Sequence, residues 1–398
     1  MTLFSIKMLE FFLPMLYNIF TILFSEIIMI YFDNASTTRV LPEAAEAAFN
    51  AMCENFGNPS SLHKLGINAE NIVKGARKTV ADALGAAEGE IYFTSCGSES
   101  NNLAFFGAAA RSGKKKHIIT TTFEHPSVLE CAKALEAKGY EVTYISPRPD
   151  GLVWPSDIAE AVREDTFLVS VMSVNNEVGS VMDIPAISKA VHLKNRDTII
   201  HTDAVQAFGK LPINAKRYGA DIISVSGHKI HAPKGIGAIY IRSGLRLAPQ
   251  ILGGGQESGV RSGTEASAQI AAFEVAVKAS HENLSENAGR IKALTARLVS
   301  ELEILPNVHI FEPFNRAPHI LSIAFEKYPS EVSMRLLEED EIYVSAGSAC
   351  SRGKKSHVLT ALGVPSRLIG STVRVSLSRF STEEDVSAFV DTVRKKLV

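Results

Sequence analysis

Between residues 41 and 262 the chain alternates apolar runs of strand length with amphipathic stretches of helical length. This alternation predicts an α/β fold, in which a mainly parallel sheet is covered by helices on both faces and binds its ligand at the carboxyl ends of the strands. The expected strands, which would form a seven-stranded sheet, are residues 91–94, 117–121, 141–145, 167–173, 198–202, 222–225 and 238–241. The helices expected between them include residues 68–84, 127–137 and 184–192.

Length and charge favour a large globular protein that does not bind nucleic acid directly. The chain has 398 residues, 46% of them hydrophobic, and a formal net charge of −2 without a basic stripe or a block of like charge. Its cysteines, which are Cys53, Cys96, Cys131 and Cys350, form no CxxC pair. Such spacing is typical neither of a disulfide framework nor of a zinc site, so we expect a reducing, cytoplasmic compartment and no bound metal.

Residues 1–28 stand apart because they are rich in Phe, Leu and Ile, which raises a signal peptide or membrane anchor as an alternative. Lys7 and Glu10 nearly cancel in charge, Pro14 interrupts the apolar run, and no small-residue cleavage site follows. We therefore expect that translation starts at Met29 and that residues 1–28 are a doubtful extension. No membrane partner is expected.

The rest of the chain is expected to divide into two domains. Residues 41–262 would form the large domain and residues 263–398 a smaller α+β domain. The smaller domain would begin with a long helical stretch from about residue 265 to 302. Residues 29–40 are expected to pack as an N-terminal segment with the small domain.

The sequence Ser-Gly-His-Lys at residues 226–229 lies between two apolar strands, about two dozen residues after Asp203. A lysine just after such a turn can present its amine to an aldehyde, which suits Lys229 as the Schiff-base residue of pyridoxal phosphate. An upstream carboxylate such as that of Asp203 would keep the pyridinium nitrogen protonated. The alternative is a solvated loop lysine and an aspartate that serves a turn.

Eight motifs run in order from about Met29 to the C-terminus. They are YFDNASTT, GNPSSLH, FTSCGSESNN, SVNNEVG, HTDAVQAFGK, SVSGHKIHAPKGIGAIY, GGGQESGVRSGT and SAGSACSRGKKSHVL. Together they resemble the signatures of cysteine desulfurases, which belong to the class V branch of the fold type I pyridoxal phosphate enzymes. The resemblance implies a sulfur-transferring enzyme whose large domain binds pyridoxal 5'-phosphate and whose small C-terminal domain carries the catalytic-cysteine loop.

Gly97 and Ser98 open an expected helix after an expected strand, where backbone N–H groups and the helix dipole favour an anion. An ordinary helix N-cap is the alternative. The resemblance places both residues on the cofactor phosphate, together with Ser226 and His228. It also implies that Thr264 reaches the phosphate of a neighbouring subunit, which predicts a homodimer with active sites at its interface.

His125 follows the end of an expected strand, from which an imidazole could stack on the pyridine ring and move protons. A structural histidine is the alternative, but the resemblance implies the catalytic role. The amides of Asn176 and Gln206 could donate to the cofactor's phenolate oxygen, and the family assigns this role to Asn176 rather than to Asn175. The histidines without a catalytic match, expected to be structural, are His201, His231 and His357.

Arg374 alternates with apolar residues along an expected strand of the small domain and could hold a substrate α-carboxylate through two parallel hydrogen bonds. A surface salt bridge is the alternative, and Arg379 is the nearest rival for the role. The matching position in the family supplies the carboxylate clamp, which implies Arg374.

Cys350 distinguishes a desulfurase from its relatives. It follows the small residues 346–349, and the three cations at positions 352, 354 and 355 favour a nucleophilic thiolate. The resemblance implies that this thiolate attacks the sulfur of L-cysteine and carries it as a persulfide to an acceptor, such as an iron–sulfur scaffold or a tRNA-thiolating enzyme. The segment between Cys350 and Ser356 is about two residues shorter than in the best-known housekeeping members.

Two alternatives remain open from the sequence. A selenocysteine lyase or another class V aminotransferase would share the fold, although an aminotransferase has no need of Cys350. A non-catalytic scaffold would have a broken set of catalytic residues, whereas the complete set is present: His125, Asp203, Gln206, Lys229, Cys350 and Arg374.

Overall fold

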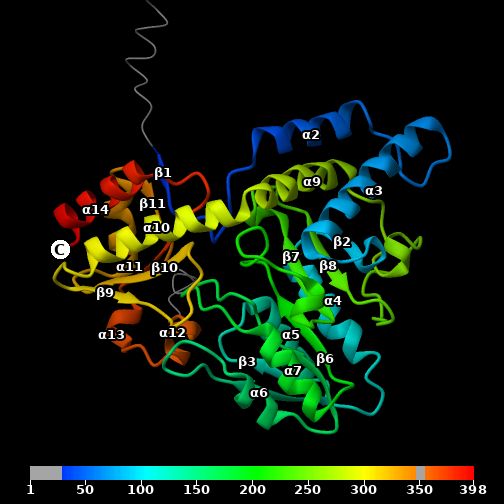
Figure 1. Cartoon of the computed structure of the whole chain (residues 1–398), viewed down its shortest axis with the longest axis horizontal. Helices are drawn as coiled ribbons and strands as arrows, with labels where there is room; N and C mark the ends of the chain where they lie inside the picture. Colours follow the sequence, from blue (N-terminus) through cyan, green and yellow to red (C-terminus); the bar gives the residue numbers. More distant parts are fainter. Residues whose placement is uncertain (1–28, 347–354) are drawn as a thin grey trace, which may run out of the picture.

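The computed structural model describes residues 29–346 and 355–398. Its centre is a seven-stranded sheet of order β2-β8-β7-β6-β5-β3-β4 (Figure 1). The strands are β2 (Ile91–Thr94), β3 (His117–Thr121), β4 (Glu141–Ile145), β5 (Thr166–Ser170), β6 (Ile199–Asp203), β7 (Ile222–Ser226) and β8 (Gly237–Ile241). Strands β4, β3, β5, β6 and β7 pair in parallel, and β8 is antiparallel to both of its neighbours. The predicted mainly parallel α/β fold is confirmed.

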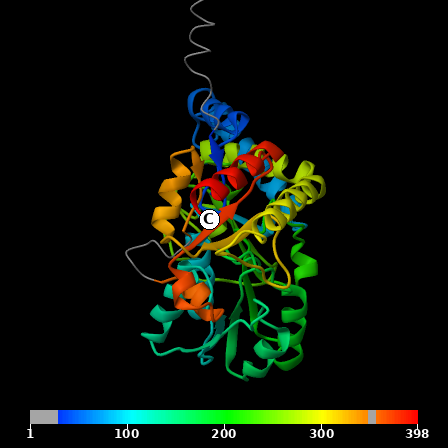
Figure 2. The same cartoon turned by 90° about the vertical axis from the view of Figure 1, so that its left-hand side faces the viewer.

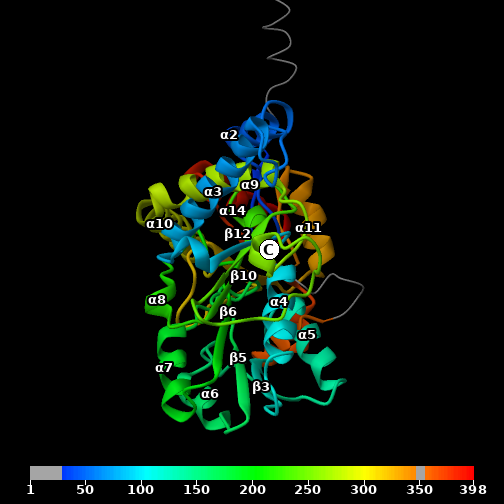
Figure 3. The same ribbon diagram turned by 90° about the vertical axis from the view of Figure 1, so that its right-hand side faces the viewer.

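Helices cover both faces of this sheet, as the alternation of the sequence predicted. On one face the core contains buried residues of α4 (Gly97–Ala109) and α5 (Pro126–Glu136). The core of the opposite face takes its buried residues from α3 (Lys64–Leu84), α6 (Pro155–Ala161), α7 (Ile184–Lys194), α8 (Ala215–Tyr218) and α9 (Ser267–Glu282). Helices α2 (Pro42–Cys53), α3 and α9 lie side by side at one end of the molecule (Figures 1 and 3).

Helix α3 illustrates how the sequence specifies these elements. Its buried residues recur three or four positions apart, at Ala69, Val73, Ala76, Val80 and Leu84, so that one apolar stripe faces the sheet. The next residue is a glycine in the left-handed conformation, with φ 63°, which ends the helix because other residues adopt that conformation at a cost.

The C-terminal part has a separate core around a three-stranded antiparallel sheet of order β12-β10-β9. Its strands and helices are β9 (Val308–Phe311), β10 (Ile320–Phe325), β12 (Thr372–Ser376), α10 (Leu284–Leu302), α11 (Ser330–Glu338), α12 (His357–Ala361), α13 (Ser366–Ile369) and α14 (Glu383–Lys396). Figure 2 views the molecule from this side, with α10 and α14 close to the small sheet.

The N-terminal segment packs with this C-terminal part. Strand β1 (Ile30–Tyr31) pairs in parallel with β11 (Ile342–Tyr343), and Asp33 bridges to Ser376. The buried side chains of Ile30 and Phe32 lie in the C-terminal core. These contacts carry residues 33–38 back across the molecule towards the large sheet.

Several boundaries differ by a few residues from the sequence-based expectation, such as the start of α3 at Lys64 rather than at residue 68. The expected strand 167–173 ends at Ser170, although the backbone N–H groups of residues 171 and 173 still donate to the carbonyls of residues 201 and 203. The long helix expected from about residue 265 to 302 is divided at Asn283, whose φ of −125° is not helical. The break lets α9 pack on α2 and α3 while α10 packs on α14. Among the helices of the described ranges, none is long and apolar enough to cross a membrane.

Candidate active site

A cavity of about 380 Å³ opens at the carboxyl ends of β2, β3, β5, β6 and β7, the edge at which the sequence predicted the ligand. We call it the site cavity. The sequence-predicted residues that line it are Gly97, Ser98, His125, Asn176, Asp203, Gln206, Ser226, His228, Lys229 and Arg374. Two predicted residues are not among the lining residues. Thr264 is exposed and lies elsewhere on the surface, and Cys350 falls outside the described residues.

Lys229 is held in a short 3-10 turn, Gly227–Lys229, directly after β7. The turn needs a glycine, because a Cβ on Gly227 would lie 2.9 Å from the side chain of Ile236. The Lys229 Nζ donates to the carbonyl oxygens of Ala35 at 2.7 Å and Ser36 at 2.5 Å. Burial, reinforced by the positive charge of Arg374, lowers the pKa of this amine to about 8. A larger fraction of nucleophilic amine is therefore present near neutral pH than an exposed lysine would have.

Asp203 ends β6 and points into the same cavity. Its Oδ1 accepts from the Val205 backbone N–H at 3.0 Å, and its Oδ2 accepts from Asn101 Nδ2 at 2.7 Å. Within the described part of the chain no Lys, Arg or His nitrogen lies within 4.0 Å of this carboxylate. A buried carboxylate without a cationic partner is suited to a pyridinium N–H, which would supply the missing positive charge.

His125 caps the N-terminus of α5 and is connected to Asp203 through two side chains. The Ser127 backbone N–H donates to His125 Nδ1 at 3.1 Å, so a neutral ring carries its proton on Nε2. The Ser127 hydroxyl lies 2.8 Å from the same nitrogen and accepts from Asn101 Nδ2 at 2.9 Å. Burial lowers the pKa of His125, and the positive charges of Lys229 and His357 act in the same direction, whereas Asp203 opposes them. The ring is thus neutral and fixed in orientation, as stacking requires.

An anion such as a phosphate fits the end of the cavity where α4 begins. A Cβ on Gly97 would lie 2.6 Å from Val205, so only glycine allows the helix to start so close to that side chain. The Ser226 hydroxyl is buried and has no hydrogen-bond partner. Burial, with the nearby lysines, lowers the pKa of His228 to about 4, so its ring is neutral and can donate one hydrogen bond. The N-terminus of α4, a buried hydroxyl and a neutral imidazole together form an anion cradle.

Arg374 lies on β12 and reaches the cavity from the C-terminal part. Its Nη1 donates to the carbonyl of Asn176 at 2.7 Å, and its Nη2 donates to Asp33 Oδ1 at 2.9 Å and to Ser36 Oγ at 2.6 Å. Its Nε is buried and has no hydrogen-bond partner among the residues that the structure describes. The rival, Arg379, does not line the site cavity. The geometry therefore favours Arg374 as the guanidinium available to a bound carboxylate.

The two amides that the resemblance singled out also line the cavity. Gln206 Nε2 donates to the Ala35 carbonyl at 2.9 Å, and its Oε1 accepts from Lys210 Nζ at 3.1 Å. Because an ammonium only donates, Lys210 fixes which end of the amide is the oxygen. The side chain of Asn175 is used internally, since it donates to the Phe123 carbonyl at 2.9 Å and accepts from two backbone N–H groups.

The three remaining histidines have structural contacts. His201 is fully buried between the hydroxyls of Ser170 and Ser224, and burial lowers its pKa to about 3. His231 Nδ1 donates to the Arg39 carbonyl at 2.9 Å. His357 Nε2 lies 2.9 Å from the carbonyl of Glu124.

Sequence reasoning missed several residues of the site. Asp33, Ala35 and Ser36 hold Lys229 and Arg374, and Asn101 connects Asp203 with Ser127. Of the missed residues, all except Ser127 lie within the quoted motifs YFDNASTT and FTSCGSESNN. The signal was therefore present in the motifs, but a backbone carbonyl or a bridging amide has no side-chain chemistry that predicts its role.

The described chain on both sides of residues 347–354 is fixed beside the site cavity. Ser345 forms an antiparallel bridge with Arg374. On the other side, Ser356 Oγ donates to Glu177 Oε2 at 2.5 Å, next to Asn176 in the chain.

Comparisons with known proteins agree with this geometry. The family model for aminotransferase class V matches residues 30–389. A protein called cysteine desulfurase IscS from Methanosarcina thermophila is 42% identical over 92% of this chain and 91% of its own length. The chain belongs to the cysteine desulfurases of the class V aminotransferase family. Members of this family use pyridoxal phosphate, and the anion cradle, the buried amine of Lys229 and the free carboxylate of Asp203 fit the three parts of that cofactor.

Solved structures of the family share the fold. A NifS-like protein, 39% identical, matches with a TM-score of 0.88 over 92% of this chain and 99% of its own. A structure described as SspA in complex with cysteine, 36% identical, matches with a TM-score of 0.79 over 89% of this chain and 100% of its own. The fold type I architecture of this cysteine desulfurase is therefore established by both sequence and structure.

Proposed function

We propose that this cysteine desulfurase converts L-cysteine to L-alanine and takes the sulfur onto Cys350 as a persulfide. The observation that carries the proposal is the site cavity, which gathers Lys229, Asp203, His125 and Arg374 from three strand ends and from the C-terminal part. The SspA structure described with cysteine is that of a relative 36% identical to this chain, which supports L-cysteine as the substrate.

Pyridoxal phosphate, when bound, supplies an aldehyde for an amine and a ring that withdraws electrons. The α4 N-terminus, with Ser98 and Ser226, would hold its phosphate, and Asp203 would keep its ring nitrogen protonated. Lys229 provides the amine, and Gln206 and Asn176 present amide donors at the cavity wall. His125 would stack on the ring and move protons through Nε2.

Arg374 would bind the substrate carboxylate by exchanging its present contacts with Ser36 and Asp33 for two parallel hydrogen bonds. The Cys350 thiolate then attacks the substrate sulfur, the sulfur–carbon bond breaks, and the carbon gains the proton that completes alanine. One L-cysteine and one Cys350 thiol thus give one L-alanine and one Cys350 persulfide, so that all atoms are conserved. A selenocysteine lyase or an aminotransferase finds no comparable support among these observations.

We also propose the sulfur acceptor, the cellular compartment and the oligomeric state. We infer that Cys350 passes its sulfur to a protein acceptor, an iron–sulfur scaffold or a tRNA-thiolating enzyme, in the cytoplasm. We infer further that the protein is a homodimer in which Thr264 of one subunit contacts the cofactor phosphate of the other. Thr264 is exposed and does not line the site cavity of its own chain, which supports this arrangement. Light scattering of the purified protein should give twice the chain mass, and Thr264→Val should weaken cofactor binding without dissociating the dimer.

The decisive test uses Cys350→Ser. The variant should still bind L-cysteine and change the visible absorbance of the cofactor, but it should release no sulfide, because a serine hydroxyl has too little alkoxide near neutral pH. Wild-type protein given L-cysteine without reductant should gain the mass of one sulfur on the peptide that carries Cys350.

Cys96 is the control, because it also lines the site cavity. Cys96→Ser should keep sulfide release. If the added sulfur were found on Cys96, or if Cys350→Ser formed alanine and sulfide at the wild-type rate, the persulfide mechanism would be refuted.

A further inference from the structure

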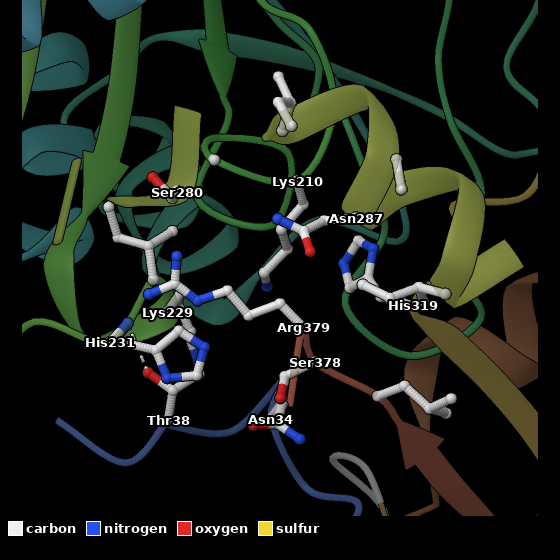
Figure 4. Close-up of a pocket in the computed structure, with 16 residues that line it drawn as sticks. Asn34, Thr38, Lys210, Lys229, His231, Ser280, Asn287, His319, Ser378 and Arg379 are labelled. Carbon is white, nitrogen blue, oxygen red and sulfur yellow. Dashed lines mark hydrogen bonds between the residues drawn. The ribbon is translucent and has the colours of Figure 1, made fainter. Parts of the chain in front are cut away.

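A second cavity of about 40 Å³ shares Lys229 with the site cavity but is lined by different polar groups. We call it the second cavity. Figure 4 shows Lys210, Asn287, His319 and Arg379 around it. These residues come from the turn after β6, from α10, from the residue before β10 and from the turn after β12. The second cavity therefore lies where the large sheet and the C-terminal part meet.

The lining of the second cavity is cationic. Lys210, Lys229 and Arg379 line it together with neutral residues, and none of the lining residues is Asp or Glu. The Lys210 Nζ donates to Gln206 Oε1 at 3.1 Å, and among the described residues no carboxylate oxygen lies within 4.0 Å of it. Burial, reinforced by Lys229 and Arg374, lowers the pKa of Lys210 to about 7. A half-buried ammonium without a nearby counter-charge is costly, and an anion beside it would reduce that cost.

His319 adds an unused donor to this lining. The residue is 1% exposed, and neither ring nitrogen has a hydrogen-bond partner. Burial, with Lys210 and Arg316, holds the pKa of His319 well below its usual value, and the Gln206 backbone carbonyl acts in the opposite direction. The ring is therefore neutral and retains one N–H with no acceptor.

Arg379 supplies a further donor. Its Nη1 donates to the Ala279 carbonyl at 2.5 Å, but its Nε is buried without a partner. The carboxylates that attract it are those of Glu43 and Glu282, and neither lines the second cavity. An acceptor inside the cavity would therefore have donors of Lys210, His319 and Arg379 available in its lining.

Size restricts what the acceptor can be. A single water needs roughly 10–15 Å³ of such space, so 40 Å³ admits about three or four particles of that size, which is room for one small anion. We propose that the second cavity binds one small monovalent anion of the size of chloride, held by the side chains of Lys210, His319 and Arg379. Because Lys210 also donates to Gln206, the bound anion keeps the lysine charged and the Gln206 amide fixed at the wall of the site cavity.

The first test measures the thermal unfolding midpoint of the holoenzyme while chloride replaces gluconate at constant ionic strength. The wild-type midpoint should rise saturably, by about 1–3 °C, because the anion binds only the folded state. Lys210→Met should abolish the rise. Lys189→Met, which removes an exposed lysine of α7, should retain it. A rise that persists in Lys210→Met, or no chloride dependence in the wild type, would overturn the proposal.

The second test does not require a variant to fold. Crystals of the wild-type holoenzyme soaked in bromide should show an anomalous peak in contact with Lys210 Nζ inside the second cavity. Water there in place of bromide would refute the anion site, whatever the thermal data show.

Discussion

The site cavity and the second cavity have Lys229 in common and differ in their charges. The site cavity contains the carboxylate of Asp203, which has no cationic partner, and an anion cradle at the start of α4. The second cavity contains cations and no carboxylate. The Lys229 amine is therefore depressed in pKa by its burial and by Arg374, while Asp203 and Asp33 limit the shift. The charges that act on this pKa are those of Arg374, Asp33 and Asp203, and none of these residues lines the second cavity.

The largest expected effect comes from removing the shared residue. Lys229→Ala should lose turnover below detection and should no longer hold the cofactor covalently, because no other lysine of the described residues lines the site cavity. Reduction with borohydride followed by mass spectrometry should attach the cofactor to the Lys229 peptide of the wild type and to no peptide of the variant. Covalent attachment at Lys210 in the wild type would reverse the roles that we assign to the two lysines.

His125→Gln tests the site cavity alone. Removing the proton-carrying ring should lower kcat by roughly 10²–10⁴-fold while cofactor binding is largely retained. Steady-state sulfide release is the measurement. His231→Gln is the matched control, since His231 lines the second cavity and donates to a backbone carbonyl, and it should leave kcat within a fewfold of wild type.

Substitutions of one arginine in each cavity test the two cavities separately. Arg374→Lys should raise KM for L-cysteine by roughly tenfold or more, because an ammonium cannot form two parallel hydrogen bonds with a carboxylate. Arg379→Lys should change KM much less. Equal increases in KM for the two substitutions would mean that the substrate carboxylate does not bind specifically to Arg374 in the site cavity.

The pKa of Lys229 predicts a pH dependence in cofactor-free protein. Acylation of this lysine, followed by mass spectrometry, should increase as the pH rises through about 8, where the amine loses its proton. Arg374→Met removes a charge that lowers this pKa, so the increase should move to higher pH. A curve that stays in place would show that Arg374 does not act on the lysine.

The smallest expected effect concerns stability and the second cavity. The folded pKa of Lys210, about 7, lies below its unfolded value of about 10.5, so its burial is unfavourable. That penalty is complete below pH 7 and decreases as the pH rises towards the unfolded value. In gluconate buffer, Lys210→Met should therefore raise the unfolding midpoint relative to wild type more at pH 7 than at pH 9.5. An equal change at both values would show that the lysine is not buried as a cation.

The sequence by itself determined the α/β class, the seven strands of the sheet and, with the family resemblance, ten of the residues that line the site cavity. It could do so because hydrophobic periodicity is local, and because each predicted residue carries a side chain suited to its chemistry, such as the amine of Lys229 or the carboxylate of Asp203. The role of Thr264 comes from the family resemblance, and the roles of Thr264 and Cys350 remain predictions.

Only the tertiary structure decided the contacts that support this site. The carbonyls of Ala35 and Ser36 accept hydrogen bonds from Lys229, which lies more than 190 residues later in the chain. Every residue has a backbone carbonyl, so the sequence does not indicate which carbonyls make this contact. The break at Asn283 and the meeting of Lys210, His319 and Arg379 likewise depend on how separate segments pack. Burial changes the charge state of a residue, and burial is a property of the assembled chain.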